Sequence, residues 1–378
     1  MFFNMDENRT SFGRAAIEEY LNGYEGRLMQ ALKSVLGTSL MESGTELMGR
    51  SLDFRGLLSQ FVKELKRRSE ASAQKEFTDA VFGRPIHFVD DDPVADKKAE
   101  STLREVAEEA GFRHIEFQYE PLAAAFDMET RATTDSLVMV ADIGAGTSDF
   151  SLIRLGPDRV HRADRKDDIL ANAGVHIGGG DYDKVLSLRK VMPELGLGTL
   201  LAGDKPVPST QYNNLAGWHT IPVAYTRRAW NHLSDVYNSS LDRAKLGKLL
   251  KVVQNREGHA IALKVEKNKI DLSTAEAADI ELADTVVGTN IASRREEFDD
   301  AAADLNQKIV HTITDMLHQA NVQSTQVDSI LFTGGTTSIP AVKNCIATMF
   351  PAARQHQGDL FGAVALGLAV DARRKFGA

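Results

Sequence analysis

The chain has 378 residues, of which 44 are Lys or Arg and 53 are Asp or Glu, giving a formal net charge of −9. This acidic balance argues against a dedicated nucleic-acid-binding protein, which normally carries a basic surplus. The single cysteine, Cys345, cannot form an intramolecular disulfide and indicates a reducing compartment. No apolar run approaches the roughly 20 residues that span a bilayer, and no secretory signal is visible. We therefore expect a cytoplasmic protein of two or three domains, with no nucleic-acid or membrane partner.

The first 75 residues are expected to be mostly helical. Apolar residues recur at helical spacing from Ile17 to Tyr24, and again from Leu57 to Leu65. The basic run from Lys63 to Arg68 suits either an anionic partner or, more typically, a solvated helix face.

From residue 77 onward, strand and helix patterns alternate, which predicts an α/β fold. Short apolar runs bounded by turn residues predict strands at residues 80–82, 115–117, 137–141, 150–153 and 329–332. Helical spacing predicts helices at residues 96–110, 120–126, 227–250, 276–280 and 358–376, and others beginning near 299 and 340. Residues 196–219 are rich in Gly, Pro, Thr and Asn and are expected to form an irregular insertion.

The turn from Asp142 to Asp149 carries the most chemistry. It follows a buried strand and precedes another, so we predict a β-hairpin with a glycine-rich turn. Gly144 and Gly146 let backbone N–H groups approach an anion, and Thr147 adds a hydroxyl. The two carboxylates are the kind of oxygen ligand that suits Mg²⁺ or its bound waters. The turn therefore predicts a nucleotide phosphate site, and the alternative is a tight turn with solvated acids.

Two further glycine turns lie between a strand and a helix. Residues 333–340, with sequence TGGTTSIP, could place a base or ribose against the backbone. Residues 178–183, with sequence GGGDYD, could face phosphates at a helix N-terminus. Taken singly, each is equally well explained as an ordinary strand-to-helix connection.

Seven segments then occur in one order along the chain: AVFGRPIHF at 80–88, EPLAAA at 120–125, DIGAGTSD at 142–149, IGGGDYD at 177–183, EKNKIDLS at 266–273, ILFTGG at 330–335 and AVALG at 363–367. With these segments the sequence resembles the nucleotide-binding domain of DnaK-type chaperones of the heat shock protein 70 family, in the actin and hexokinase superfamily. The closest likeness is to the YegD-type branch of bacterial putative chaperones. The resemblance implies a two-lobed, actin-like ATPase fold with ribonuclease H-like lobes that binds ATP or ADP with Mg²⁺ between them.

The resemblance also implies a division into four subdomains. A helical subdomain, with a remnant of the first lobe's strands, would cover residues 1–76, and the first lobe's core would cover 77–132 with 357–378. The second lobe's core would cover 133–177 with 304–356, and its outer subdomain would cover 178–303.

The roles of individual residues follow from the same resemblance. Catalytic roles fall to Lys33, Glu120, Asp142, Thr147 and Asp149. Lys33 would steady the γ-phosphate, Asp142 would order the waters of Mg²⁺, and Asp149 would lie near the attacking water. The nucleotide would be held by Gly144, Ala145, Gly146, Thr147, Gly178, Gly179, Gly180, Glu266, Lys269, Ser273, Gly334, Gly335, Thr336 and Ser338. Of these, Glu266, Lys269 and Ser273 match positions that hold ribose and adenine.

Three departures from the family pattern bear on activity. Ile270 and Ser338 stand where the family clamps adenine between two arginines, so the cation–π contribution of about 0.5–2 kcal/mol each is absent. The first phosphate loop, Asp-x-Gly-Thr-Thr, does not occur in the sequence. The first lobe is therefore expected to lack its N-terminal strands, with Met1 either a misplaced start or the start of a remnant. The peptide-binding half of full chaperones is also not expected.

Three functions remain open from the sequence. The first is an ATP-binding, chaperone-related ATPase module that communicates with client proteins or co-chaperones. The second is a pseudo-ATPase that senses nucleotide or acts as a scaffold. The third is an actin-like filament subunit. ATP hydrolysis is expected only if the first phosphate loop is supplied upstream or compensated.

Overall fold

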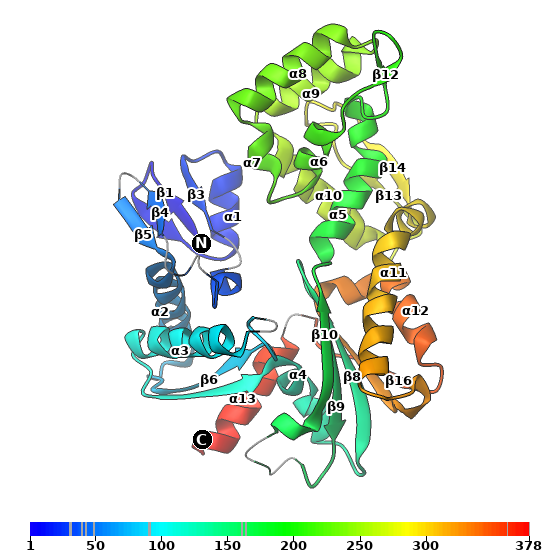
Figure 1. The fold of residues 1–378 in the computed structure, drawn as a ribbon. Coiled ribbons are helices and arrows are strands. Elements are labelled where there is room, and N and C mark those ends of the chain that lie inside the picture. The colour runs from blue at the N-terminus through cyan, green and yellow to red at the C-terminus, as the bar shows by residue number, and fades with distance from the viewer. Residues whose placement is uncertain are drawn as a thin grey trace. The chain divides into compact units, whose positions relative to one another are not determined.

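A computed structural model describes residues 1–29, 32–38, 41, 44–47, 50–89, 92–159, 162, 165–360 and 362–377. The chain forms two compact units, Met1–Met128 with Gly362–Ala378, and Glu129–Phe361. Each unit has its own elements, which Figure 1 labels. The finer division into four subdomains stays a prediction. Every helix in the described part of the chain is too short or too polar to span a bilayer.

The first unit begins with short strands. Its elements are β1 (Phe2–Asn4), β2 (Arg9–Ser11), α1 (Arg14–Leu21), β3 (Gly26–Leu28), η1 (Leu32–Val35), β4 (Gly44–Leu47), β5 (Arg50–Asp53) and α2 (Phe54–Ala73). Strand β1 lies between β2 and β3 in one sheet, and β4 pairs with β5. The two predicted helices are present, but the expectation of a mostly helical segment is wrong. Strands of three or four residues are too short to give a clear alternating pattern.

The remainder of the first unit is a parallel strand pair with covering helices. It contains β6 (Asp79–Arg84), α3 (Pro93–Glu109), β7 (His114–Tyr119), α4 (Glu120–Glu129) and α13 (Ala363–Phe376), and β6 runs parallel to β7. Helix α3 begins where the Asp92 side chain accepts hydrogen bonds from Val94 and Ala95, an N-cap. A Cβ on Gly367 of α13 would lie 1.8 Å from the Ala123 carbonyl oxygen of α4. The two helices therefore pack at a distance that only glycine permits at position 367.

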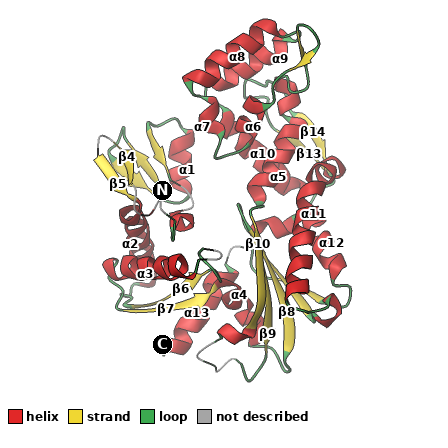
Figure 2. Ribbon diagram, viewed as in Figure 1, coloured by secondary structure: helices red, strands yellow, loops and turns green. Residues whose placement is uncertain are grey.

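The second unit is built on a five-stranded sheet in the order β10-β9-β8-β15-β16. Its strands are β8 (Ser136–Ile143), β9 (Ser148–Leu155), β10 (Ile169–Val175), β15 (Ser329–Thr333) and β16 (Arg354–Gln357). All five residues of β15 are buried, as expected of a strand covered on both faces. Helices α11 (Arg295–Gln319) and α12 (Pro340–Met349) lie beside this sheet (Figure 2). Short 3-10 turns occur at Lys166–Asp168, Ser324–Gln326 and Gly335–Ser338.

Between the strands β10 and β15, the chain forms the outer part of the second unit. It contains α5 (Gly179–Lys190), η4 (Met192–Leu195), β11 (Leu200–Leu201), β12 (Lys205–Pro206), α6 (Thr210–Ala216), α7 (Ile221–Ala224), α8 (Arg227–Ser239), α9 (Arg243–Gln254), α10 (Gly258–Leu272), β13 (Ala277–Ile280) and β14 (Ile291–Arg294). One continuous hydrophobic core joins this part to the sheet and includes the fully buried rings of Tyr182, Tyr212 and Phe298.

Several sequence-based assignments in this outer part are wrong. Residues 277–280 form a strand, because they pair with β14, and not a helix. The insertion at 196–219 is not irregular throughout, since it contains β11, β12 and α6. The helix expected at 227–250 is two helices, because Asp242 caps a new one through the Lys245 amide at 3.0 Å. The last helix begins at Ala363 and not at residue 358.

Candidate functional site

The predicted β-hairpin is confirmed, and its turn is open to solvent. Strands β8 and β9 place Asp142 directly opposite Asp149. The turn closes with a hydrogen bond of 2.9 Å from the Gly144 amide to the Thr147 carbonyl oxygen. Thr147 also donates its hydroxyl to the Asp149 carboxylate at 3.0 Å. A Cβ added to Gly146 would meet nothing within 4 Å, so there is room for a ligand against the backbone.

The second glycine turn, at the start of α5, is bonded to this hairpin turn. The Gly179 amide donates to the Gly144 carbonyl oxygen at 3.0 Å, and the Gly180 amide donates to Ala145 at 2.9 Å. A Cβ on Gly178 would lie only 2.4 Å from the Gly146 nitrogen. Glycine at 178 is therefore required by the close approach of two backbones rather than by a special φ.

The third glycine turn, after β15, reaches the same place. Thr336 donates its hydroxyl to the Gly144 carbonyl oxygen at 2.8 Å. Gly334 has φ +80°, and a Cβ there would lie 2.3 Å from the Ile143 carbonyl oxygen. The three turns are far apart in sequence, and all of them meet around residues 143–147. The neighbouring Gly335 is half-buried, and Ser338 is exposed.

Helix α10 carries the residues predicted to hold the nucleoside. Lys269 is 7% exposed, and its ammonium donates to the Gly179 carbonyl oxygen at 3.1 Å. It also forms an ion pair of 2.8 Å with Asp183. Glu266 is exposed, and Ser273 donates its hydroxyl to the Lys269 carbonyl oxygen at 3.1 Å. Ile270, at a position where the resemblance implies an arginine, is 58% exposed.

Asp183 is a largely buried carboxylic acid on the helix that starts at these turns. The pKa of Asp183 is raised to about 6, because burial, with smaller contributions from Glu266 and Asp181, raises it more than Lys269 lowers it. The loss of hydration on burial therefore raises the pKa of Asp183 more than the ion pair with Lys269 lowers it.

In the first unit, the structure brings two predicted catalytic residues together. The Lys33 ammonium donates to the Glu120 carboxylate, although 87 residues separate them in sequence. Their side chains are 45% and 28% exposed. A Cβ on Gly83 of β6 would approach Glu120 Cγ to 3.0 Å, so the glycine leaves space for the glutamate. This pair joins the EPLAAA segment to Lys33, which lies outside the seven segments on which the resemblance rests.

Sequence reasoning assigned no role to three polar residues that hold the turns. The Asp181 carboxylate accepts from the Gly178 amide at 3.0 Å. The buried Ser148 hydroxyl donates to the Ile177 carbonyl oxygen at 2.7 Å. Asp183 pairs with Lys269. Both aspartates lie in the GGGDYD segment, so acids within one turn of a glycine run were the available signal.

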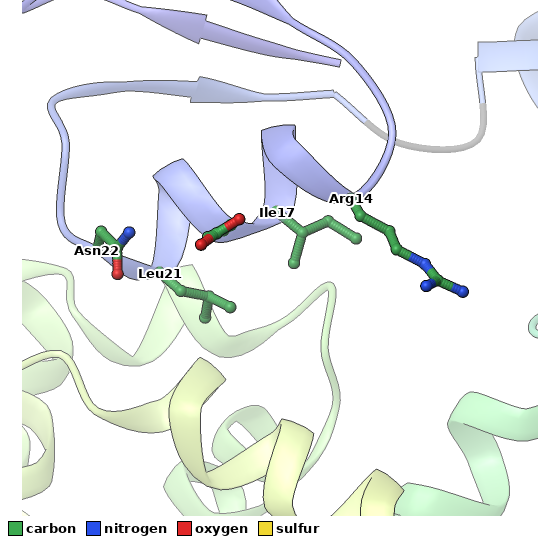
Figure 3. Close-up of a pocket in the computed structure, with 5 residues that line it drawn as sticks. Arg14, Ile17, Leu21 and Asn22 are labelled. Atoms are coloured by element: carbon green, nitrogen blue, oxygen red, sulfur yellow. The ribbon is translucent and has the colours of Figure 1, made fainter.

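A separate hollow lies along helix α1 in the first unit (Figure 3). It is lined by Arg14, Ile17, Glu18, Leu21 and Asn22. The side chains of Ile17 and Leu21 project from the same side of the helix. None of these residues was predicted as a site residue.

The described residues contain no group of three or more His, Cys, Asp or Glu side chains arranged to hold a metal ion. A magnesium ion commonly keeps several waters and uses only one or two carboxylates. The role predicted for Asp142, which is to order those waters, needs no such group and stays a prediction.

The sheet of the second unit and its hairpin turn, together with the α/β first unit, define an actin-like ATPase fold. The family described as Hsp70 protein matches residues 33–191 and 242–377, which is most of the chain. The chain therefore belongs to the Hsp70 family and corresponds to its nucleotide-binding domain. Its place in the YegD-type branch stays a prediction.

Curated relatives agree with this family. The chain is 24% identical over 336 residues to "Chaperone protein DnaK" of Deinococcus deserti and to that of Deinococcus radiodurans, covering 86% of this chain and 44% of each relative. It is 24% identical over 301 residues to "Chaperone protein DnaK 3" of a Synechococcus strain, covering 76% of this chain and 36% of the relative. The chain thus spans less than half the length of these relatives.

Proposed function

We propose that this chain is a chaperone-related ATPase module that binds ATP or ADP with Mg²⁺ at the three glycine turns of the second unit. The observation that carries the proposal is the convergence of the three turns, in which the Gly179 and Gly180 amides and the Thr336 hydroxyl donate hydrogen bonds of 2.8–3.0 Å to carbonyl oxygens of the hairpin turn. These bonds hold the exposed segment Ala145–Thr147 in place, and the backbone amides of that segment, with little side-chain bulk above Gly146, would suit a phosphate group.

Different groups of the hairpin turn would bind the phosphate and its metal ion. The exposed backbone of Ala145 and Gly146 presents N–H donors, and the Thr147 hydroxyl lies beside them. Asp142 would bind the water shell of Mg²⁺, with Asp149 close to the attacking water. When bound, Mg²⁺ supplies positive charge that stabilises the charge developing on the phosphoryl oxygens. The resemblance assigns the other two catalytic roles to Lys33 and Glu120, whose side chains pair within the first unit.

The adenine side of the site is expected to bind weakly. Ile270 can cover one face of a base, but neither it nor Ser338 supplies the cation–π contribution of an arginine. The loss corresponds to about one order of magnitude in affinity for each missing arginine. Nucleotide recognition would then depend more on the phosphates than on the base.

Replacing Asp142 by asparagine is expected to weaken ATP binding about tenfold or more in the presence of Mg²⁺, which is about 1.4 kcal/mol. Asparagine keeps the shape of the side chain but removes the charge that orders the metal's waters. The measurement is calorimetric titration with ATP, with Mg²⁺ and with EDTA. With EDTA, the variant and the unchanged protein should bind ATP with similar affinity.

The matched control is Asp158→Asn. Asp158 is an exposed aspartate beyond the far end of β9, so its loss should leave both affinities unchanged. An Asp142→Asn variant that loses the same affinity with and without Mg²⁺ would show that Asp142 does not act through the metal. A variant with unchanged affinity in both conditions would contradict the assignment of the site. Phosphate release under saturating Mg–ATP then separates an active ATPase from a nucleotide sensor.

A further inference from the structure

The contacts that Lys269 makes in the structure differ from the role that the family resemblance gives it. The resemblance makes it a ribose contact. In the structure its side chain is 9% exposed, and its ammonium lies 2.8 Å from Asp183 Oδ1 and 3.1 Å from the Gly179 carbonyl oxygen. Both partners belong to helix α5, whereas Lys269 belongs to α10. Lys269 is thus engaged with protein groups at the start of the phosphate-facing helix.

Lys269 binds Gly179, and Gly179 is one of the residues that connect the second glycine turn to the hairpin turn. Gly179 accepts from Lys269 with its carbonyl oxygen, and its own amide donates to Gly144 at 3.0 Å. The next amide, that of Gly180, donates to Ala145 at 2.9 Å. A displacement of the α5 N-terminus would therefore move both of the α5 amides that donate to the hairpin turn. In this way α10, which carries the residues predicted to hold the nucleoside, is connected to the hairpin turn, which is predicted to hold the phosphates.

Among the groups that shift the pKa of Asp183, Lys269 is the one cation. The negative charges of Glu266 on α10 and Asp181 on α5 both disfavour the charged form of Asp183. The Asp183 side chain is only 19% exposed, so water compensates its charge poorly. Removing Lys269 would leave a largely buried carboxylate beside two other acids. Removing the Asp183 charge would leave Lys269 buried with only a carbonyl acceptor. The two side chains should therefore depend on each other.

We propose that Lys269 and Asp183 act together as a positioning pair, which holds the start of α5 against the hairpin turn and thereby sets the phosphate-binding geometry. This inference rests on the proposed function. It assigns Lys269 an indirect role through Asp183 and Gly179, in place of direct contact with the ribose. It also gives a role to Asp183, which sequence reasoning left unassigned.

The test compares Lys269→Met, Asp183→Asn and the double variant at pH 7.5. Affinities for Mg–ATP and for adenosine are measured by calorimetry, because adenosine keeps the ribose and lacks the phosphates. Each single variant should weaken Mg–ATP binding about tenfold or more and adenosine binding less than about threefold. The double variant should bind Mg–ATP no more weakly than the weaker-binding single variant, since both changes remove the same interaction. The control is Lys267→Met, an exposed lysine on the same helix paired with Asp271 and Glu281, which should change neither affinity.

Other outcomes overturn the pair. If Lys269→Met weakened adenosine and Mg–ATP by the same factor while Asp183→Asn changed neither, Lys269 would be a ribose contact. Urea unfolding of the four proteins without nucleotide gives a second readout. Non-additive losses of stability support the pair, and additive losses contradict it. If the unchanged protein bound neither ATP nor adenosine, the proposed function would fail, and the unfolding cycle alone would decide whether Lys269 and Asp183 act as a pair.

Discussion

Replacing Gly178 by alanine is expected to reduce ATP affinity at least about a hundredfold, which is about 2.7 kcal/mol. The new Cβ would lie 2.4 Å from the Gly146 nitrogen and 2.5 Å from the Ala145 carbonyl carbon. Both are backbone atoms, so they cannot turn aside as a flexible side chain would. The hairpin turn must move, and the hydrogen bonds from Gly179 and Gly180 to it would be lost. We also expect a loss of about 1–3 kcal/mol in the free energy of unfolding, which is typical of overpacking.

The matched control is Gly247→Ala in helix α9. A Cβ at Gly247 meets only Tyr237 Cε2, at 3.7 Å, which is ordinary van der Waals contact. Alanine favours a helix interior over glycine by about 0.8–1.0 kcal/mol, so this variant should be as stable as the unchanged protein or more stable. Calorimetry with ATP and urea unfolding measure both effects. A Gly178→Ala protein with unchanged ATP affinity would mean that the turn of residues 144–147 does not hold the phosphates.

Replacing Arg165 by methionine is expected to lower the free energy of unfolding by about 3–5 kcal/mol, the range for breaking a buried ion pair. Arg165 is 4% exposed and Glu129 is 1% exposed. The guanidinium donates to both Glu129 carboxylate oxygens, at 2.7 and 2.9 Å, and also to Asp168. Methionine fills much of the same volume but leaves the Glu129 charge without its bidentate partner. Urea unfolding followed by circular dichroism measures the change.

The control for this effect is Arg67→Met on α2. Arg67 makes the same type of bidentate contact, with Glu64 at 2.8 Å, but its side chain is 67% exposed. An exposed pair contributes about 0–1 kcal/mol, so the control should be nearly unchanged. The double variant Glu129→Leu with Arg165→Met should be less destabilised than Arg165→Met alone, since it leaves no unpaired Glu129 charge. If Arg165→Met and Arg67→Met lowered the free energy of unfolding by the same amount, burial would not explain the contribution of the Arg165 ion pair to stability.

Local signals in the sequence were sufficient for the hairpin of the site. The strand at 137–141, the glycines at 144 and 146 and the strand at 150–153 are adjacent, so composition alone placed the turn between them. Helical spacing likewise predicts a helix at 96–110, although the structure begins it three residues earlier, at Pro93, after the Asp92 N-cap.

Pairings between distant segments were not accessible in the same way. Residues 276–280 read Glu-Ala-Ala-Asp-Ile, which favours a helix by propensity. The pairing of Ala277–Ile280 with Ile291–Arg294 overrides that preference. Lys269 and Asp183 are likewise 86 residues apart, and their contact depends on the packing of α10 against α5. Motif matching therefore assigned Lys269 to the predicted nucleotide site but could not identify its partner.

The most direct test of the account is a calorimetric titration of the full chain with ATP in the presence of Mg²⁺. The convergence of the three glycine turns on residues 143–147 predicts saturable binding at one site per chain. The predicted affinity is reduced, because Ile270 and Ser338 replace the two arginines of the family. Saturation at one ATP per chain would support the phosphate site. The absence of any saturable heat up to millimolar ATP would contradict it.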